Sequence, residues 1–217
     1  MTDIDFKEKT KTLIDSLKSI SANYGLGNDG NEFKIITQVF LYKFMNDKFA
    51  YEVKKIDSKL QNAENWEKEI SAYSEEEYEM LLLQLGADTA KLKPQHFISE
   101  LFGRQNESDF AKLFDDTLMD IAITNNDIFS VKTDGGAKVV LFDRLTEYIS
   151  DGSKRDAFAK AIINKLVGVS FEHIFNQKFD FYATIFEYLI KDYNTNSGGK
   201  YAEYFTPHAV AKIMAAI

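Results

Sequence analysis

Residues 33–44 read FKIITQVFLYKF, and this stretch sets the expected fold of the chain. Its apolar residues recur every three or four positions, which places them on one face of an α-helix. The residues that follow this spacing, including two further along the chain, are Phe33, Ile36, Phe40, Phe44, Ile56 and Leu60. We therefore expect a long helix here that lies at the centre of the core.

The segments on either side of this helix also have helical periodicity. Residues 4–21 carry one apolar stripe, formed by Phe6, Leu13, Ile14, Leu17 and Ile20. Further helices are expected at 75–85, 142–150, 154–167 and 179–193. The chain contains two prolines, far fewer than a turn-rich β fold would use. The sequence therefore predicts a mainly α, multi-helix domain.

Three local patterns predict where helices begin and end. Ser74 and Glu77 have the spacing of a capping box, and Gly86 is placed to close that helix in a left-handed conformation. Ser108 is placed to cap a helix that carries Phe110. These caps predict short helices separated by tight turns.

Two segments do not read as helices. Residues 128–141 contain β-branched runs around an Asp-Gly-Gly turn, which predicts either a small β-hairpin or a loop followed by a helix start. Residues 194–199 form a polar, glycine-bearing linker. We therefore divide the chain into a helical N-terminal domain, 1–193, and a linker with the start of a second domain, 194–217.

Composition excludes several classes of protein. The chain has 217 residues, of which 45% are hydrophobic and 28% charged, which argues against a disordered protein. It lacks cysteine, and its three histidines are scattered, so we expect no disulfide and no metal site. No apolar stretch is long enough for a membrane helix, and no signal peptide is visible, so we expect a cytoplasmic protein without membrane partners. The net charge of −8 disfavours a protein that coats DNA by itself.

Several candidate sites have a simpler structural interpretation. Gly25, Gly27 and Gly30 have the spacing of a dinucleotide-binding loop, but a helix precedes them where that motif needs a strand. We interpret them as a connector between helices. His96 and His173 lie in apolar helical stretches and have no partner at ligand spacing, so packing or surface placement is expected.

The segment around Thr206 is the strongest candidate site. Thr206 followed by Pro207 predicts the start of a helix, whose free backbone N–H groups can bind a carboxylate or phosphate. Tyr204 and Phe205 precede this start and can form an apolar wall. A small anionic ligand site and a capped helix with packed aromatic residues are both compatible with this pattern.

The string Tyr204-Phe205-Thr206-Pro207 resembles a motif of adenine-N6 DNA methyltransferases, most closely the modification subunit of type I restriction-modification systems. Upstream segments at 40–47 and 179–190 are also similar to that family in order and spacing. The resemblance implies that the second domain is an α/β S-adenosylmethionine-dependent methyltransferase domain. It implies cofactor binding by residues 204–207, with Glu203 and His208 as weaker candidates. The family often has glycine at the position of Ala202 and a basic residue at that of His208.

The resemblance also implies partner subunits and the absence of the catalytic motif from these residues. The family's catalytic Asn-Pro-Pro-aromatic motif does not occur in these residues, so we expect a truncated methyltransferase domain, no catalytic residue in this chain and no activity by itself. The implied partners are a specificity subunit, a second modification subunit, a restriction subunit and, through the complex, duplex DNA. The helical domain would then serve assembly and closure around DNA. Two alternatives stay open: a helical protein–protein interaction module with no cofactor site, and a nucleotide-binding enzyme that uses the Gly25 to Gly30 loop.

Overall fold

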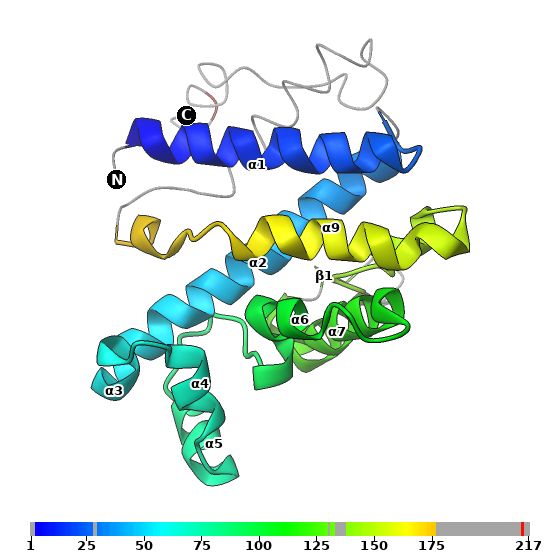
Figure 1. Ribbon diagram of the computed structural model, residues 1–217. Helices are drawn as coiled ribbons and strands as arrows, with labels where there is room; N and C mark the ends of the chain where they lie inside the picture. Colours follow the sequence, from blue (N-terminus) through cyan, green and yellow to red (C-terminus); the bar gives the residue numbers. More distant parts are fainter. Residues whose placement is uncertain (1–2, 28–29, 130, 133–137, 177–213, 215–217) are drawn as a thin grey trace.

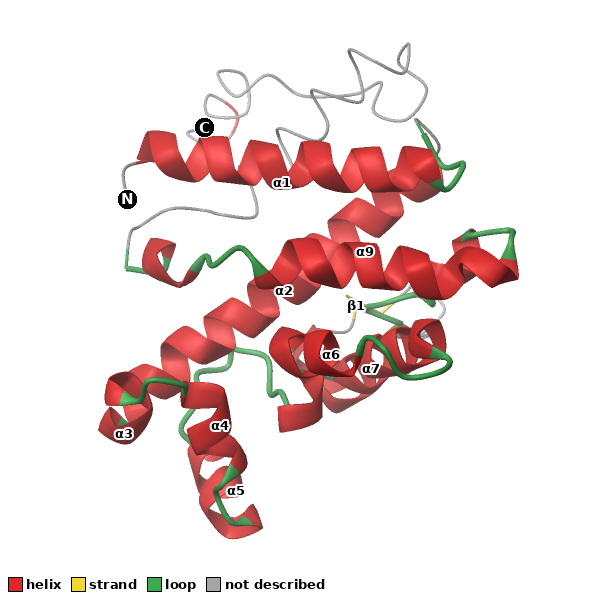
Figure 2. Ribbon diagram, in the orientation of Figure 1, coloured by secondary structure: helices red, strands yellow, loops and turns green. Residues whose placement is uncertain are grey.

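The computed structural model describes residues 3–27, 30–129, 131–132, 138–176 and 214. Described side chains are those of residues 8–27, 30–129, 140–176 and 214. In chain order the elements are α1 (Asp3–Asn23), α2 (Gly30–Ile56), α3 (Ser58–Asn62), α4 (Trp66–Ser71), α5 (Glu75–Leu83), the 3₁₀ turn η1 (Pro94–His96), α6 (Ile98–Arg104), α7 (Phe110–Thr124), α8 (Asn126–Phe129), β1 (Val131–Lys132), β2 (Lys138–Val139), η2 (Leu145–Tyr148), η3 (Gly152–Lys154), α9 (Arg155–Val167) and η4 (Glu172–Ile174). The prediction of a mainly α chain is confirmed (Figure 2).

Helix α9 lies in the middle of the helical body (Figure 1). It packs against α1 on one side and against α6 and α7 on the other, while α2 crosses behind it. Phe158 and Ile162 of α9 are at most 1% exposed, and so are Phe114 and Leu118 of α7. Burial of each such side chain contributes about 1.5–3 kcal/mol to the stability of the fold. Helix α9 connects this part of the fold, because it contacts α1, α6 and α7.

Helix α2 confirms the prediction made from residues 33–44. Ile36, Val39, Phe40 and Phe49 are at most 1% exposed. The helix ends at Ile56, and Leu60 is buried from the separate short helix α3. The expected core helix is therefore present, with its last turn replaced by a break at Asp57, which caps α3 by accepting a hydrogen bond from the Lys59 N–H.

The connection from α1 to α2 is a glycine turn. Gly25 has φ +87°, and the N–H groups of Tyr24 and Leu26 both donate to the Ser21 carbonyl. Glycine adopts this left-handed conformation without steric cost, which is why it commonly ends helices. The prediction of a helix connector rather than a phosphate loop is supported, since α1 and not a strand leads into the turn.

The capping box of α5 is confirmed, because the Glu77 N–H donates to Ser74 Oγ and the Ser74 N–H donates to the Glu77 carboxylate. Two other caps were wrongly predicted. Gly86 does not have a positive φ, and α5 ends two residues earlier with Gln84 in right-handed helical conformation.

Ser108 does not cap α7, because the cap position falls on Asp109, at φ +58°. The first turn of α7 is satisfied from another helix instead. The Ala111 N–H donates to the Asp156 carboxylate of α9 at 2.8 Å. A tertiary contact of this kind has no local sequence signal.

The predictions for two adjacent segments, a hairpin or loop at 128–141 and a helix at 142–150, have different outcomes. Val131 pairs with Val139 in an antiparallel two-stranded ladder, so the hairpin alternative for this segment is correct. Residues 142–150 are not an α-helix: they contain only the 3₁₀ turn η2. Among the described residues, no helix combines the length and the apolarity needed to cross a bilayer. The predicted helix at 179–193 and the boundary at 193–194 lie outside the described residues.

Candidate functional site

The predicted cofactor-binding residues lie outside the described part of the structure. These residues are Glu203, Tyr204, Phe205, Thr206, Pro207 and His208. The last described stretch before them in sequence ends with Phe171–Asn176, which contains η4. Its contacts show how the helical body holds the last described part of the chain before residue 177.

A buried ionic cluster on α2 holds the start of this stretch. The Phe171 N–H donates to Asp47 Oδ2 at 2.7 Å, while Lys43 Nζ and Asn46 Nδ2 donate to Asp47 Oδ1 at 2.9 and 3.0 Å. Lys43 and Asp47 are 4% and 3% exposed, so water is largely excluded from this ion pair. Buried charges need such partners to offset the cost of desolvation. We call Lys43, Asn46 and Asp47 the α2 cluster.

The α2 cluster joins two further parts of the fold. Asn46 Oδ1 accepts a hydrogen bond from the Ile98 N–H at the start of α6. The Phe171 ring stacks on Phe40 of α2 with centroids 6.3 Å apart, and both side chains are 1% exposed. The position of Phe171 is therefore fixed by one hydrogen bond to a buried carboxylate and by ring packing.

The end of the stretch is fastened closer to the surface. Lys54 Nζ lies 2.7 Å from Glu172 Oε2, and the Tyr51 hydroxyl lies 2.5 Å from Asn176 Oδ1. Phe175 packs edge-on against Phe44, with the ring centroids 5.4 Å apart. The last described residues before the candidate segment are thus bound along one face of α2, from Phe40 to Lys54.

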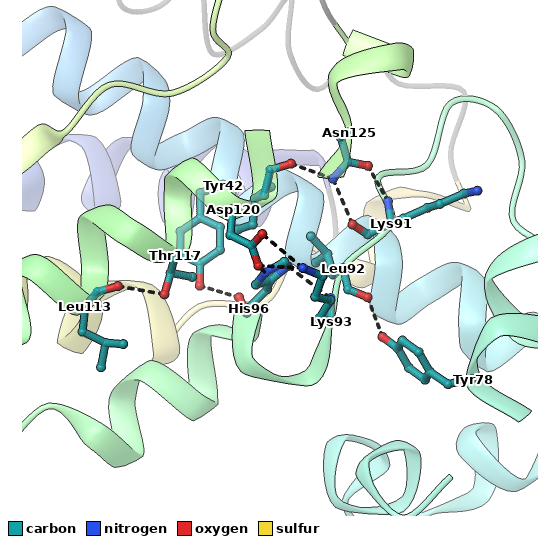
Figure 3. A network of polar contacts seen from close by, with 11 residues as sticks. Tyr42, Tyr78, Lys91, Leu92, Lys93, His96, Leu113, Thr117, Asp120 and Asn125 are labelled. Carbon is teal, nitrogen blue, oxygen red and sulfur yellow. Dashed lines mark hydrogen bonds and ion pairs between the residues drawn. The ribbon is translucent and has the colours of Figure 1, made fainter. Parts of the chain in front are cut away.

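His96 occupies a second polar cluster, shown in Figure 3. Its Nδ1 accepts a hydrogen bond from the Lys93 N–H at 3.1 Å, so Nδ1 carries no proton, and Nε2 lies 2.7 Å from Asp120 Oδ2. The neutral ring with its proton on Nε2 satisfies both contacts. Burial lowers the pKa of His96 below its ordinary value, and the neighbouring Asp120 only partly offsets this. We call Lys93, His96 and Asp120 the α7 cluster.

The α7 cluster has a structural role. His96 is fully buried, and the Tyr42 hydroxyl donates to its carbonyl at 2.6 Å. Lys93 Nζ lies 2.8 Å from Asp120 Oδ2. A general base must reach a substrate proton, which a ring without exposed surface does not. The expectation that His96 is a packed residue is supported.

A nearby asparagine completes the attachment of this loop to α7. Asn125 accepts a hydrogen bond from the Lys91 N–H at 2.7 Å and donates to the Lys91 carbonyl at 2.9 Å. The Tyr78 hydroxyl of α5 donates to the Leu92 carbonyl at 2.5 Å (Figure 3). The loop between α5 and α6 is therefore bound on both sides, by α7 and by α5.

His173 lies in η4 and is partly buried. Burial lowers its pKa, and the positive charge of Lys9 acts in the same direction. Its Nε2 is buried without a hydrogen-bond partner. No group of His, Asp or Glu able to hold a metal ion occurs among the described residues.

A groove of about 840 Å³ separates α1 from the end of α9. Lys9 and Thr12 line one side, and Lys165 and Ser170 line the other. Glu8 and Leu13 also contribute, so the surface is of mixed charge and polarity. This arrangement selects no particular ligand.

Sequence reasoning missed the α2 cluster. Lys43 and Asp47 are four residues apart on one helix, and a charged pair at this spacing is usually solvent-exposed. The available signal was their position: both lie within the helix expected at the centre of the core. An ion pair in such a helix must find internal partners.

Comparison with known proteins gives one match. Residues 177–217 match the family model described as N-6 DNA Methylase. No curated protein and no solved structure matches the chain significantly. The matching segment begins directly after Asn176, the last residue of the described stretch that contacts α2, and it contains the string from Tyr204 to Pro207. The C-terminal segment of this chain is thus similar to adenine-N6 DNA methyltransferases.

Proposed function

We propose that this chain is the N-terminal part of the modification subunit of a type I restriction-modification system, which methylates adenine N6 in DNA. The observation that carries the proposal is the N-6 DNA Methylase match at 177–217, together with the Tyr204-Phe205-Thr206-Pro207 string inside it. The helical body that precedes the match is consistent with a role in assembly rather than in chemistry.

In this proposal, S-adenosylmethionine supplies the methyl group carried on its sulfonium. Thr206 and Pro207 would begin a helix whose free N–H groups donate hydrogen bonds to the cofactor carboxylate, and Tyr204 and Phe205 would provide apolar contact. Glu203 and His208 are weaker candidates for the same site. Asn-Pro-Pro does not occur in the 217 residues, so this chain alone would not transfer methyl groups.

The helical body would position the cofactor domain and contact the specificity subunit and a second modification subunit. The restriction subunit and duplex DNA would join through the complex. The body's part in catalysis is then orientation of the reactants, which can contribute several orders of magnitude to a rate. The net charge of −8 supports DNA contact through partners rather than through this chain.

The test is made in the host organism, with substitutions introduced into the natural gene that encodes this chain. Long-read sequencing maps N6-methyladenine in the genome, and we expect a fully modified target that loses its methyl groups in a strain with Phe205→Ala and Thr206→Ala. Ile123→Gln, at a side chain 70% exposed on α7, serves as the control and keeps methylation. If the chain is instead a helical interaction module without a cofactor site, the target is either unmethylated in the wild type or stays methylated in the strain with substitutions at residues 205 and 206.

A further inference from the structure

Helix α5 projects from the helical body at the end far from α1 (Figures 1 and 2). Its inner side is fixed: Leu81 is 4% exposed, and the Tyr78 hydroxyl binds the Leu92 carbonyl. The capping box at Ser74 fixes its start. A helix held in this way presents its outer side in one defined orientation, which reduces the entropy lost when a partner binds.

The outer side of α5 is apolar where solvent-facing side chains are ordinarily polar. Met80 is 56% exposed and Leu83 is 72% exposed. Glu76, Met80 and Leu83 follow one another at spacings of four and three residues, so they share one face of the helix. We call these three residues the outer face of α5. Neighbouring large apolar side chains on one exposed face are typical of an interaction site.

The charges around this face are predominantly negative, although Lys59 lines a groove beside Glu76 and Met80. Glu75, Glu76 and Glu79 are exposed, and none of them forms an ion pair with another described residue. The sequence from Ser74 to Asp88 contains no lysine or arginine. An apolar partner surface that carries basic groups at its edge would therefore complement this face in charge.

This charge pattern disfavours other occupants. A twofold contact between two copies through α5 would bring the same glutamates together, because such an interface pairs one patch with itself. DNA and anionic membranes carry the same sign of charge as the face and would be repelled. A protein surface with an apolar pocket and a basic edge is the occupant that fits.

We infer that the outer face of α5 is the docking site for a partner protein that offers an apolar pocket edged by lysine or arginine. The inference deepens the assembly role proposed above. That the partner is a subunit of the complex rests on the proposed function. Two apolar side chains are fewer than a standard interface of about 800 Å² per partner contains, so they act as anchors within a larger or transient contact.

The test measures binding of a defined probe to the whole 217-residue chain. The probe is a fluorescein-labelled helical peptide of about four turns, with leucines along one face and lysines beside them. Fluorescence anisotropy is recorded for the wild type, for Met80→Gln with Leu83→Gln, and for Glu76→Gln with Glu79→Gln. Two controls change the same residue types elsewhere: Ile123→Gln on α7, and Glu100→Gln with Glu147→Gln, which removes two negative charges from exposed positions.

We expect saturable binding to the wild type that weakens about tenfold or more in the apolar variant. The charge variant should bind about threefold more weakly and with a smaller dependence on salt, while both controls bind as the wild type does. Absence of binding, or equal loss in the controls, would overturn the inference. A wild-type dimer in analytical ultracentrifugation that the apolar variant loses would overturn it too, in favour of self-association. None of these readouts involves methyl transfer, so they fail independently of the proposed function.

Discussion

The α2 cluster and the α7 cluster both bind loops to helices, yet water reaches them to different extents. In the α2 cluster, Lys43 and Asp47 have side chains that are each 5% exposed. In the α7 cluster, the side chains of Lys93 and Asp120 are 41% and 40% exposed, and only the ring of His96 is buried. The difference decides what happens when one partner is removed: water can replace it in the α7 cluster but not in the α2 cluster.

The largest expected effect is at Asp47. Asp47→Ala leaves the Lys43 ammonium buried without its counter-ion and the Phe171 N–H without its acceptor, which should cost about 3–5 kcal/mol of unfolding free energy. Urea unfolding measures this loss. Asp88→Ala is the matched control, since the Asp88 side chain is 78% exposed, and it should change stability by about 0.5 kcal/mol or less. A loss below about 1 kcal/mol at Asp47 would show that water enters the α2 cluster after all.

A double variant sharpens the same point. Lys43→Met combined with Asp47→Leu removes both charges, so no charge is left buried alone. The double variant should be more stable than Asp47→Leu by about 1–3 kcal/mol, although it carries one more substitution. The full double-mutant cycle by urea unfolding measures this coupling. Additive losses would mean that the buried pair contributes nothing as a pair.

The pH dependence of stability tests the buried part of the α7 cluster. Burial lowers the pKa of His96, so on acidification the unfolded state binds a proton before the folded state does. The contribution is complete above the ordinary histidine pKa of about 6.5 and is lost as pH falls below it, by at most about 1.4 kcal/mol per pH unit. Urea midpoints of the wild type should fall more steeply than those of His96→Phe over this window. His173 contributes with the same sign to both proteins, and a steeper fall in the variant would contradict the assignment.

A smaller effect is expected at Asp120. Asp120→Asn keeps an oxygen that can accept from His96 Nε2 and removes only the half-exposed ion pair with Lys93. The loss should be about 0.2–1 kcal/mol and should shrink at high salt. Unfolding at low and high sodium chloride measures both. A loss as large as that of Asp47→Ala would remove the contrast between the two clusters.

The smallest effect is expected on the outer face of α5. Met80→Gln and Leu83→Gln should each change stability by about 0.5 kcal/mol or less, because both side chains are exposed in the free chain. Leu81→Ala, on the buried side of the same helix, should cost about 2–5 kcal/mol. Thermal unfolding separates the two sides. Strong destabilisation by Leu83→Gln would show that this face packs within the chain.

The sequence was informative where one helix face is apolar. Leu13, Ile14 and Leu17 of α1 are buried as their spacing predicts, and the capping box at Ser74 forms because all of its contacts are local. Contacts between distant segments were not predictable. Asp156 serves the first turn of α7 from α9, and Asp47 binds an amide 124 positions away. Local patterns carry no information about such partners.

The candidate site was predictable only as a motif. The family match covers the segment that contains Tyr204 to Pro207, which agrees with the resemblance read from that string. The individual roles of Glu203 to His208 stay predictions, because these residues lie outside the described structure. The contacts that hold the chain before the match could not be foreseen, since they depend on a buried ion pair of α2.

The fastening of Phe171 to Asp47 gives the segment after Asn176 a fixed starting point. Phe171 and Ile98 are bound by neighbouring residues of one helix, so a partner that shifts the middle of α2 would carry η4 and the start of α6 with it. Two segments that lie more than 70 positions apart in sequence would therefore be displaced together, through adjacent side chains of a single helix.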